Sequence, residues 1–466
     1  MNDLLIINKK DNVGVSLKAS KVKLGHKVAL RNIKKGEQVI KYGEVIGIAK
    51  ANIKKGDWVH SHNLVSHLNQ KFTYSYQPHL TKVKKIRGYF LGYKRKNGPA
   101  GIRNDIYLIP TVGCVNSLAK ILKAKANKLK LGSIDHIHAV THQFGCSQLG
   151  DDHNNFKKLL VSLALNPNAT YVIFIGLGCE NNQINGIKEL LKPYKRDSIF
   201  FYNAQEVDDD VTYGFNLLKK LVSKASKLKR SKVSLSELTI GLKCGGSDAF
   251  SGLTANPKVG EVSDKLISYG GSSVLTEVPE MFGAEQILMN KCLNKSIYQK
   301  YLKLITDFKK YYTDLGFPVY ENPSPGNREG GITTLEEKSL GCITKAGSTP
   351  IVDVLDYTEI VKRSGLNVLN GPGNDLIAAT ALAASGAQLI LFTTGRGTPF
   401  ATIVPTIKIA TNKNLAKHKK NWIDFDAESF SSEQLFKLVI DTASGKYKSK
   451  QEDNGEIAFF KKGVTL

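Results

Sequence analysis

The sequence of 466 residues contains little cysteine, tryptophan, methionine or proline: six, two, three and 14 residues, respectively. Six cysteines are too few for the disulfide framework of a secreted protein of this length. No apolar segment approaches the roughly 20 uninterrupted residues of a membrane-spanning helix, and the first residues lack the apolar region of a signal peptide. We therefore expect a cytoplasmic protein that does not insert into a membrane.

Acidic residues are also scarce, with 41 Asp and Glu against 66 Lys and Arg, which gives a net charge of +25. Such an excess raises the question of nucleic-acid binding. The lysines, however, are spread from Lys9 to Lys462, and the sequence contains no zinc finger, aromatic RNA-binding motif or long basic tail. We interpret the excess as a solvated surface and expect no nucleic-acid partner.

The length favours two or three domains, because one hydrophobic core rarely grows this large. Residues 1–70 contain short β-like segments separated by turns, and NIKKGEQV at 32–39 nearly repeats as NIKKGDWV at 52–59. This spacing predicts a small all-β domain over residues 1–70. Residues 71–85 are polar and basic with no helical or strand period, which indicates a linker.

Beyond the linker, strand-like apolar runs alternate with helical patterns, as in a parallel sheet with helical crossovers. We divide this part into an α/β domain at 86–230 and a C-terminal α/β domain at 231–466, both with mainly parallel sheets. Ligands of such sheets bind at the carboxyl ends of the strands. The fold class is therefore α/β, with a small β domain in front.

Cysteines follow several of the predicted strands. Cys146, Cys179 and Cys244 each stand beside glycines, and His142 lies near the first of them. Soft thiolates with imidazole suit iron or zinc, although a free cysteine is often only a small buried side chain. There is no CxxC pair, so the ligands would converge from distant loops. Cys114 and Cys342 are weaker candidates. Cys292 lies on a predicted helix and is interpreted as a packing residue.

Other polar segments suggest acid–base chemistry and anion binding. His60 and His62 alternate in WVHSHN, so an extended strand would place both on one side; the alternative is that one satisfies a turn backbone. The loop at 321–341 and its Lys338 suit a carboxylate or phosphate, or form an ordinary surface loop. Arg396, in TTGRGTP, suits bidentate carboxylate recognition, or an ion pair within its domain. No Walker A or GxGxxG motif supports nucleotide binding.

These segments together resemble the altronate/galactarate dehydratase family of hydro-lyases, nearly from end to end. The matching segments are GHKVAL (25–30), KYGEVIG (41–47), WVHSHN (58–63), IPTVGCVN (109–116), FGCSQLGDDH (144–153), GLGCENNQ (176–183), CGGSDAFSGLTANP (244–257), TEVPEMFGAE (276–285), ENPSPGN (321–327), TTGRGTP (393–399) and NWIDFDA (421–427).

The resemblance implies that the first domain is of the SAF type. It also implies an Fe(II)-dependent loss of water from D-altronate to give 2-keto-3-deoxy-D-gluconate in hexuronate (galacturonate) catabolism. The alternatives for the metal are Mn(II) or a [4Fe-4S] cluster. The alternatives for the function are galactarate or another sugar acid as substrate, or an inactive sugar-acid-binding protein. The expected partners are the sugar acid and, as an open alternative, a second copy of the chain in a homodimer.

On this basis we assign candidate residues to three roles. Catalysis in the first domain is assigned to His26, His60 and His62. Substrate binding is assigned to Asn322, Ser324, Asn327, Lys338 and Arg396. Metal binding is assigned to His142, Cys146, Cys179 and Cys244. The sequence leaves open which histidine is the base and which is the acid.

Overall fold

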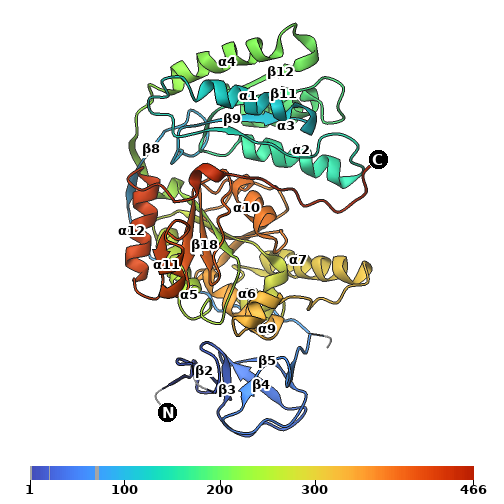
Figure 1. The fold of residues 1–466 in the computed structure, drawn as a ribbon, viewed down its shortest axis with the longest axis vertical. Helices are drawn as coiled ribbons and strands as arrows, with labels where there is room; N and C mark the ends of the chain where they lie inside the picture. Colours follow the sequence, from blue (N-terminus) through green and yellow to red (C-terminus); the bar gives the residue numbers. More distant parts are fainter. Residues whose placement is uncertain (1–2, 20, 69–72) are drawn as a thin grey trace.

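The computed structural model describes residues 3–19, 21–68 and 73–466. The C-terminal domain lies between the first domain, at one end, and the second domain, at the other (Figure 1). Residues 71 and 72 of the expected linker lie outside the described residues. Residues 73–85 contain no helix or strand and run along the C-terminal domain, where His79 N donates to Asn290 O at 2.7 Å. The chain therefore runs past the C-terminal domain before it forms the second domain.

The first domain is all β, as predicted, and consists of two small antiparallel sheets. One sheet has the order β1-β2-β3-β6 and the other β4-β5-β7. The two near-repeats pair through Ile33 and Ile53, which are both buried. The strands are β1 (Leu4–Leu5), β2 (Val13–Ser16), β3 (Lys27–Ala29), β4 (Gln38–Lys41), β5 (Glu44–Ala49), β6 (Trp58–Val59) and β7 (Leu64–Val65).

The second domain contains a four-stranded parallel sheet in the order β10-β9-β11-β12. Ile106 and Leu108 of β9 pack with α1 and α4, whereas Tyr107 and Ile109 pack with α2 and α3. This alternation buries both faces of the sheet (Figure 1). The elements are β9 (Asp105–Pro110), α1 (Asn116–Ala126), β10 (Ile137–Ala139), α2 (Asp151–Ala164), β11 (Ala169–Gly176), α3 (Ile184–Leu191), β12 (Ile199–Asn203) and α4 (Asp210–Ala225).

The C-terminal domain is built on a seven-stranded parallel sheet in the order β16-β17-β15-β14-β18-β19-β20. Its elements are β14 (Thr239–Cys244), α5 (Ala255–Ser268), β15 (Ser272–Leu275), α6 (Glu285–Met289), α7 (Lys295–Asp314), α8 (Pro325–Glu329), α9 (Leu335–Cys342), β16 (Ile351–Leu355), β17 (Gly365–Leu369), α10 (Asp375–Ala384), β18 (Leu389–Thr394), β19 (Thr406–Ala410), α11 (Lys413–His418), β20 (Phe425–Asp426) and α12 (Ser432–Ala443).

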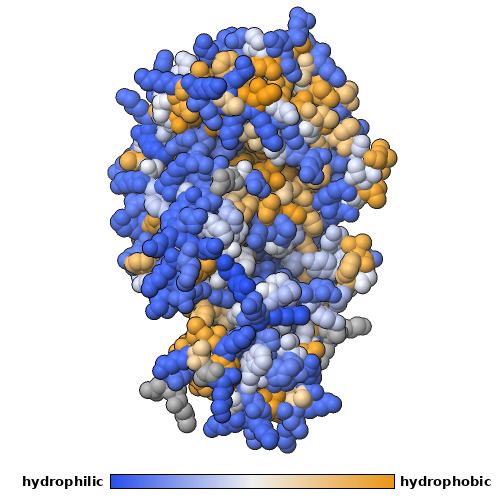
Figure 2. Space-filling model, in the orientation of Figure 1, coloured by the Kyte–Doolittle hydropathy of each residue, from blue (hydrophilic) through white to orange (hydrophobic). Residues whose placement is uncertain are grey.

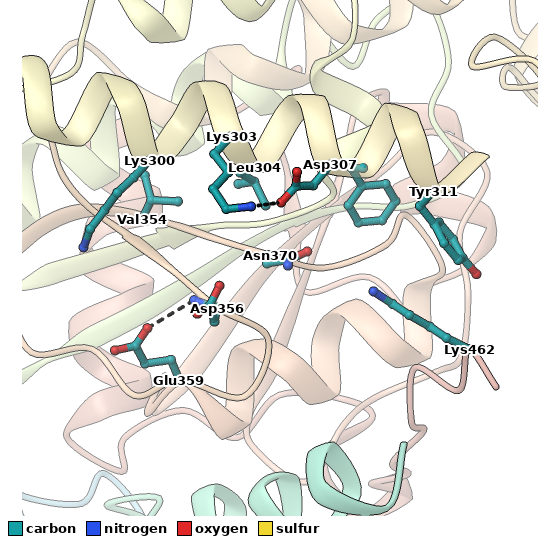
Figure 3. Close-up of a pocket in the computed structure, with 11 residues that line it drawn as sticks. Lys300, Lys303, Leu304, Asp307, Tyr311, Val354, Asp356, Glu359, Asn370 and Lys462 are labelled. Carbon is teal, nitrogen blue, oxygen red and sulfur yellow. Dashed lines mark hydrogen bonds and ion pairs between the residues drawn. The ribbon is translucent and has the colours of Figure 1, made fainter. Parts of the chain in front are cut away.

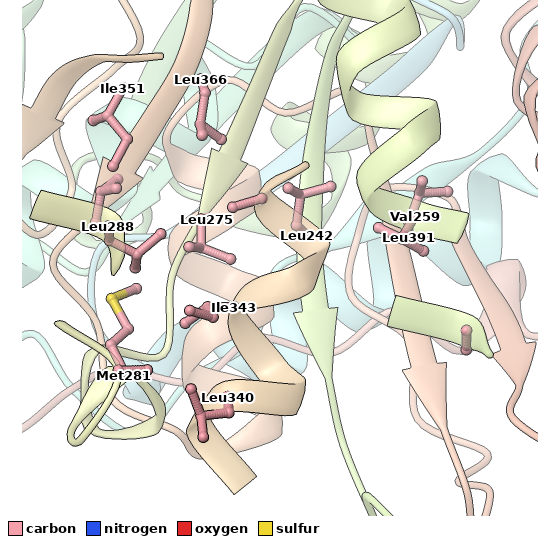
Figure 4. Packing of buried hydrophobic residues seen from close by; sticks show 14 of the residues in the cluster. Leu242, Val259, Leu275, Met281, Leu288, Leu340, Ile343, Ile351, Leu366 and Leu391 are labelled. Atoms are coloured by element: carbon pink, nitrogen blue, oxygen red, sulfur yellow. The ribbon is translucent and has the colours of Figure 1, made fainter. Parts of the chain in front are cut away.

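Apolar side chains of neighbouring strands form the core of this domain. Leu242, Leu275 and Leu391 come from three adjacent strands and belong to one buried cluster with Val259 of α5 and Leu340 of α9 (Figure 4). Burial of such a large side chain is worth about 1.5–3 kcal/mol. The core therefore fixes the strand ends that carry the polar residues described below.

The α/β domains share one buried apolar cluster and are also joined by two segments of the chain. The strands β8 (Tyr89–Gly92) and β13 (Ser231–Ser234) form an antiparallel ribbon where the chain enters and leaves the second domain. The C-terminal segment returns to that domain, where Leu466 N donates to Ser147 O at 2.9 Å. On the face in Figure 2, hydrophilic side chains lie over the middle of the junction between the first and C-terminal domains, with a hydrophobic patch beside them.

Two details bear on the expectations from the sequence. Within the described residues, no helix is both long and apolar enough to cross a membrane. Cys292, expected on a helix, instead follows α6 and forms a bridge with Ile351. The prediction that Cys292 lies on a helix is therefore wrong, because the helix α6 ends at Met289 and a turn follows.

Candidate active site

Three neighbouring strands of the C-terminal sheet end in polar residues. Cys244 is the last residue of β14, Glu277 follows β15, and Arg396 follows β18. The residue directly after β14 must be glycine. A Cβ at Gly245 would lie 2.5 Å from Phe392 Cζ and 2.7 Å from the Asp375 carboxylate. Parallel strands bring their carboxyl ends to one edge, so these residues share one side of the sheet.

A cluster of buried charges lies at this edge. Glu277 accepts hydrogen bonds from Lys243 and from Lys345, the latter at 2.9 Å. Glu280, in the short helix after Glu277, pairs with Lys338 at 2.8 Å. These five side chains are each at most 7% exposed. Buried charges are tolerated only when paired, so the cluster is a built feature and not a solvated surface.

The two carboxylates of the cluster have opposite pKa shifts. Burial raises the pKa of Glu277 to about 7, despite the adjacent ammonium groups. Burial also opposes ionisation of Glu280, but the charges of Lys338, Lys243 and Lys345 outweigh it and lower the pKa of Glu280 to about 2. Carboxylates with separated pKa values are suited to different proton-transfer roles. Of the two carboxylates, Glu277 therefore has the higher proton affinity, which a general base requires, although both of its oxygens are bound in this arrangement, by Lys243, Lys345 and the Cys244 amide.

Two thiols lie within the same cluster. Cys342 Sγ lies 3.0 Å from Glu280 Oε2, and Cys244 Sγ lies 2.7 Å from Ser247 Oγ. The hydrogen bond available from Cys342, aided by the charge of Lys345, lowers the pKa of Cys244 well below its ordinary value, whereas the pKa of Cys342 is raised well above it. Cys244 is thus the more acidic thiol of the two.

Four of the five predicted substrate-binding residues meet beside this cluster. Lys338 Nζ donates to Asn322 Oδ1 at 3.0 Å and to Asn327 Oδ1 at 3.3 Å. Ser324 caps α8 and exchanges hydrogen bonds with Asn327. A cavity of about 10 Å³ is lined by Lys338, Cys342 and residues of the first domain, which is room for about one water molecule.

The first domain covers this region with its histidines. His26 Nε2 donates to Glu329 O at 3.1 Å, and His60 Nε2 donates to Arg328 O at 2.9 Å. Trp58 Nε1 donates to His26 Nδ1 at 3.1 Å. Burial lowers the pKa of both histidines, which are therefore neutral at pH 7. In this arrangement they bind the end of α8 and do not contact the thiols.

His62 does not lie on the same side as His60. The strand β6 ends at Val59, and a turn follows, in which Leu64 N donates to His60 O at 2.9 Å. His60 is buried, whereas His62 is exposed beside the ring of Trp58. The expectation that both imidazoles share one side is wrong, because the period of an extended strand does not apply within a turn.

The first domain is also attached by a buried ion triplet that the sequence did not reveal. Lys27 and Lys41 bind the two oxygens of Glu337 of α9, at 2.7 and 2.8 Å. The charges of both lysines overcome burial and hold the pKa of Glu337 far below its usual range. One signal was present: Lys41 alternates with buried Val39 in β4, so its side chain had to point inward.

Arg396 lies at the outer rim of the region. Arg396 Nη2 lies 3.0 Å from Glu329 Oε2, and the two side chains are 47% and 62% exposed. The backbone carbonyl of the same Glu329 accepts the hydrogen bond from His26. Arg396 is therefore near the first domain and α8, and its guanidinium is accessible to a ligand from solvent.

The predicted metal residues belong to two domains. Cys146 and Cys179 are exposed in loops at the carboxyl edge of the second sheet, and Asn182 N donates to Gly145 O between these loops. Cys114, in the adjacent loop, is exposed as well. Cys244 instead is buried in the C-terminal domain with the partners described above. Cys114, Cys146 and Cys179 therefore lie in loops of one domain and Cys244 in another, and among the described residues the three exposed thiols do not form a close group of metal-ligand atoms.

His142 is buried in the second domain and makes two backbone contacts. Its Nε2 donates to Pro110 O at 2.7 Å, and its Nδ1 accepts from Phe144 N at 3.2 Å. Burial lowers its pKa to about 4, so the ring is neutral at pH 7. Both ring nitrogens are engaged, and a metal ion would have to displace one of these hydrogen bonds.

A surface pocket of about 280 Å³ lies between α7 and the ends of β16 and β17 (Figure 3). Of its charged side chains, Lys303 pairs with Asp307 at 2.5 Å within the pocket, and Lys300 pairs with Asp353 outside it at 3.0 Å. The pocket lacks the convergent thiols and carboxylates of the buried cluster. The buried cluster beneath the first domain is therefore the stronger candidate for the active site.

Comparison with known families covers all three domains. Residues 17–67 match the altronate/galactarate dehydratase SAF domain. Residues 92–226 match the second domain of D-galactarate dehydratase/altronate hydrolase. Residues 235–465 match the C-terminal domain of D-galactarate/altronate dehydratase.

Individual proteins give the same result. The chain is 46% identical to an altronate dehydratase of Bacillus subtilis (strain 168) over 100% of both chains. It is 46% identical to an altronate dehydratase of Escherichia coli (strain K12), over 98% of this chain and 94% of that protein. It is 31% identical to a galactarate dehydratase (L-threo-forming) of the same organism, over 92% of this chain and 88% of that protein. The chain therefore belongs to the altronate/galactarate dehydratase family.

Proposed function

We propose that this protein is an altronate dehydratase, a hydro-lyase that converts D-altronate to 2-keto-3-deoxy-D-gluconate in hexuronate catabolism. The observation that carries the proposal is the 46% identity to two altronate dehydratases over essentially the full length. Galactarate is the second candidate substrate, and the lower identity of 31% to a galactarate dehydratase makes it the weaker one.

The reaction removes the proton from C2, next to the carboxylate, and expels the hydroxyl group of C3 as water. The resulting enol then becomes the 2-keto acid. Proton removal is difficult because negative charge accumulates on the carboxylate, so fixed positive groups must stabilise it. We assign this role to Lys338 and Arg396, with Asn322, Ser324 and Asn327 orienting Lys338 or the sugar hydroxyls.

We assign the base to Glu277, because burial brings its pKa to about 7 and a base works best near the operating pH. The acid that protonates the leaving hydroxyl is assigned to the first domain, where His26, His60 and His62 are the candidates. His26 and His60 are neutral at pH 7 in this arrangement, so each must take up a proton before it can act as the acid. His26 and His60 are engaged with α8 in this arrangement. A cavity of about 10 Å³ is too small for a six-carbon acid, so substrate entry requires the first domain or α8 to move.

We include Fe(II) in the proposal, with Mn(II) or a [4Fe-4S] cluster as alternatives. Three ammonium groups, Lys243, Lys338 and Lys345, surround the buried carboxylates and disfavour a further cation beside Cys244. Cys146 and Cys179 are exposed thiols in loops joined by a hydrogen bond, and soft donors of this kind fit iron. When bound, iron would supply Lewis-acid stabilisation of developing negative charge.

One experiment tests the substrate. Purified full-length protein is incubated with Fe(II) and a reductant on altronate, galactarate and related aldonates, and the 2-keto-3-deoxy product is measured. We expect altronate to give the highest kcat/KM. A higher value on galactarate would favour the second candidate, and tight binding of a sugar acid without product would indicate the inactive binding protein.

A further inference from the structure

A group of metal-ligand residues lies far from the thiols, at the amino edge of the second domain's sheet. Asp105 is the first residue of β9, and His136 and His138 lie at the start of the neighbouring β10. The two strands pair in parallel, with Ile137 opposite Ile106. One ligand atom from each of Asp105, His136 and His138 lies within 4.8 Å of the other two. Nothing in the proposed reaction uses these residues.

Three polar atoms of this group are buried without a hydrogen-bond partner among the described residues: Asp105 Oδ2, His136 Nε2 and His138 Nε2. Asp105 is 0% exposed and His138 5%. Asp105 Oδ2 and His138 Nε2 face each other at 3.7 Å. An unsatisfied buried polar atom costs about 1–3 kcal/mol, and such atoms commonly mark an unseen water or ion.

The third ligand is already oriented toward the same point. Asp105 Oδ1 accepts a hydrogen bond from His136 N at 3.1 Å and lies 3.2 Å from His136 Nδ1. The short helix Glu452–Asn454 returns from the C-terminal domain, where His136 Nε2 lies 3.2 Å from Asp453 Oδ1. Separations of about 3–4 Å between donor atoms are those of ligands around one ion with bonds of about 2.0–2.2 Å.

The surrounding charges leave room for a cation. Glu452 is paired with Arg103, at 3.0 Å from Nη2 to Oε2, and Asp453 with Lys448 at 2.8 Å. Among the described residues, Asp105 forms ion pairs with His136 and His138 but with no lysine or arginine. With both imidazoles neutral, one carboxylate charge of the group remains uncompensated.

We propose that Asp105, His136 and His138 bind a divalent first-row transition-metal ion such as Zn²⁺, and that Asp453, on the far side of the His136 ring, orients this imidazole. Imidazole nitrogen with carboxylate oxygen suits zinc and its neighbours, whereas Ca²⁺ and Mg²⁺ prefer oxygen ligands alone. The ion would tie the segment at Glu452–Asn454 to the amino edge of β9 and β10. Its role is structural and independent of the proposed reaction.

A proton is the competing occupant. The adjacent imidazoles of His136 and His138 lower the pKa of Asp105 to about 2 against the effect of burial, and Asp105 raises the pKa of His136 despite burial. A protonated His136 paired with Asp105 would satisfy part of the group without any metal. The experiment must therefore measure binding itself, because either occupant stabilises the fold.

The test uses the full-length protein, stripped with a chelator and titrated separately with Zn²⁺ and Co²⁺. Binding is followed by metal content after dialysis, by the visible absorption of Co²⁺, and by Tm. The variant His138→Gln removes one ligand, and His153→Gln is the matched control, because His153 is a half-buried histidine of the same domain outside the group. Cys146→Ser separates this site from any thiol site.

Beyond any Co²⁺ that Cys146→Ser abolishes, we expect one Co²⁺ per chain with a visible band that excess Zn²⁺ abolishes, and a higher Tm with Zn²⁺. His138→Gln should weaken Co²⁺ binding at least about tenfold, whereas His153→Gln and Cys146→Ser should keep both the band and the Tm response. Wild-type protein without the band and without the Tm response would overturn the proposal, even if His138→Gln failed to fold. An unchanged band in folded His138→Gln would overturn it as well.

Discussion

Lys27 of the first domain lies 2.7 Å from Glu337 of the C-terminal domain, measured from Nζ to Oε2, and neither side chain is more than 1% exposed. Lys41 binds the other oxygen of the same carboxylate. The two lysines come from the two sheets of the first domain, so one glutamate fixes both sheets against α9. This contact holds the domain over the candidate active site.

Removal of this carboxylate should detach the first domain. Glu337→Gln leaves two buried ammonium groups without a counter-charge, which should lower the free energy of unfolding by about 3–5 kcal/mol. Urea unfolding measures the loss, and proteolysis within residues 73–85 reports the detachment. Asp307→Asn is the control, because it removes one partner of an exposed pair worth at most about 1 kcal/mol. Equal effects of the two substitutions would contradict this role of Glu337.

His142 should make stability depend on pH below neutrality. Its pKa is about 4 in the folded protein and about 6.5 in the unfolded chain. Between these values the unfolded chain binds more protons, so the free energy of unfolding falls as the pH is lowered from 6.5 to 4, by up to about 3 kcal/mol.

The variant His142→Gln tests this dependence. It should be less stable than the wild type at pH 7 but lose less stability between pH 6.5 and 4, as measured by urea unfolding at each pH. Substitution of the exposed His62 by Gln is the control and should leave the wild-type slope. If His142→Gln keeps the full slope, another group causes the acid sensitivity.

Arg396 is expected to bind the substrate carboxylate. Arg396→Lys loses the bidentate geometry and should reduce kcat/KM by an amount equivalent to about 2–5 kcal/mol. Tm should hardly change, since the pair with Glu329 is exposed. Glu329→Gln releases Arg396 without removing it and should not raise KM. Near-normal kcat/KM with a large loss of Tm in Arg396→Lys would assign Arg396 a structural role.

Iron content should separate the two groups of cysteines. Cys146→Ser and Cys179→Ser should lower the iron bound per chain, because they remove exposed thiols of the second domain. Cys244→Ser should keep the iron yet reduce activity, because Cys244 lies in the buried charged cluster. Cys292→Ser, a buried cysteine outside both groups, should keep the iron. Full iron in both second-domain variants would exclude these thiols as ligands.

Sequence patterns predicted the fold well, because strand alternation and turn spacing are local. The all-β first domain, the parallel sheets and the strand ends that carry Cys146, Cys179 and Cys244 follow from such patterns. The ion triplet of Lys27, Lys41 and Glu337 did not, because its partners are about 300 residues apart and lysine is normally a surface residue.

The candidate site was predicted only in part, for the same physical reason. Asn322, Asn327 and Lys338 are close in sequence and meet as expected. The role of Glu277 and Glu280 depends on lysines from other elements, which no single segment reveals. Cys244 and Cys146 follow similar glycine-containing strand ends but belong to different sheets, and a strand-end pattern does not say which edge it joins. Iron, the cytoplasmic location and a homodimer stay predictions.

The most direct test compares the wild type with Glu277→Gln on altronate, with Fe(II) present and the fold checked by Tm and circular dichroism. The substitution keeps the shape of the side chain but removes the base assigned to the C2 proton. We predict formation of the 2-keto-3-deoxy acid by the wild type and a kcat at least about 100-fold lower in the variant. No product from the wild type, or an undiminished kcat in folded Glu277→Gln, would contradict the account.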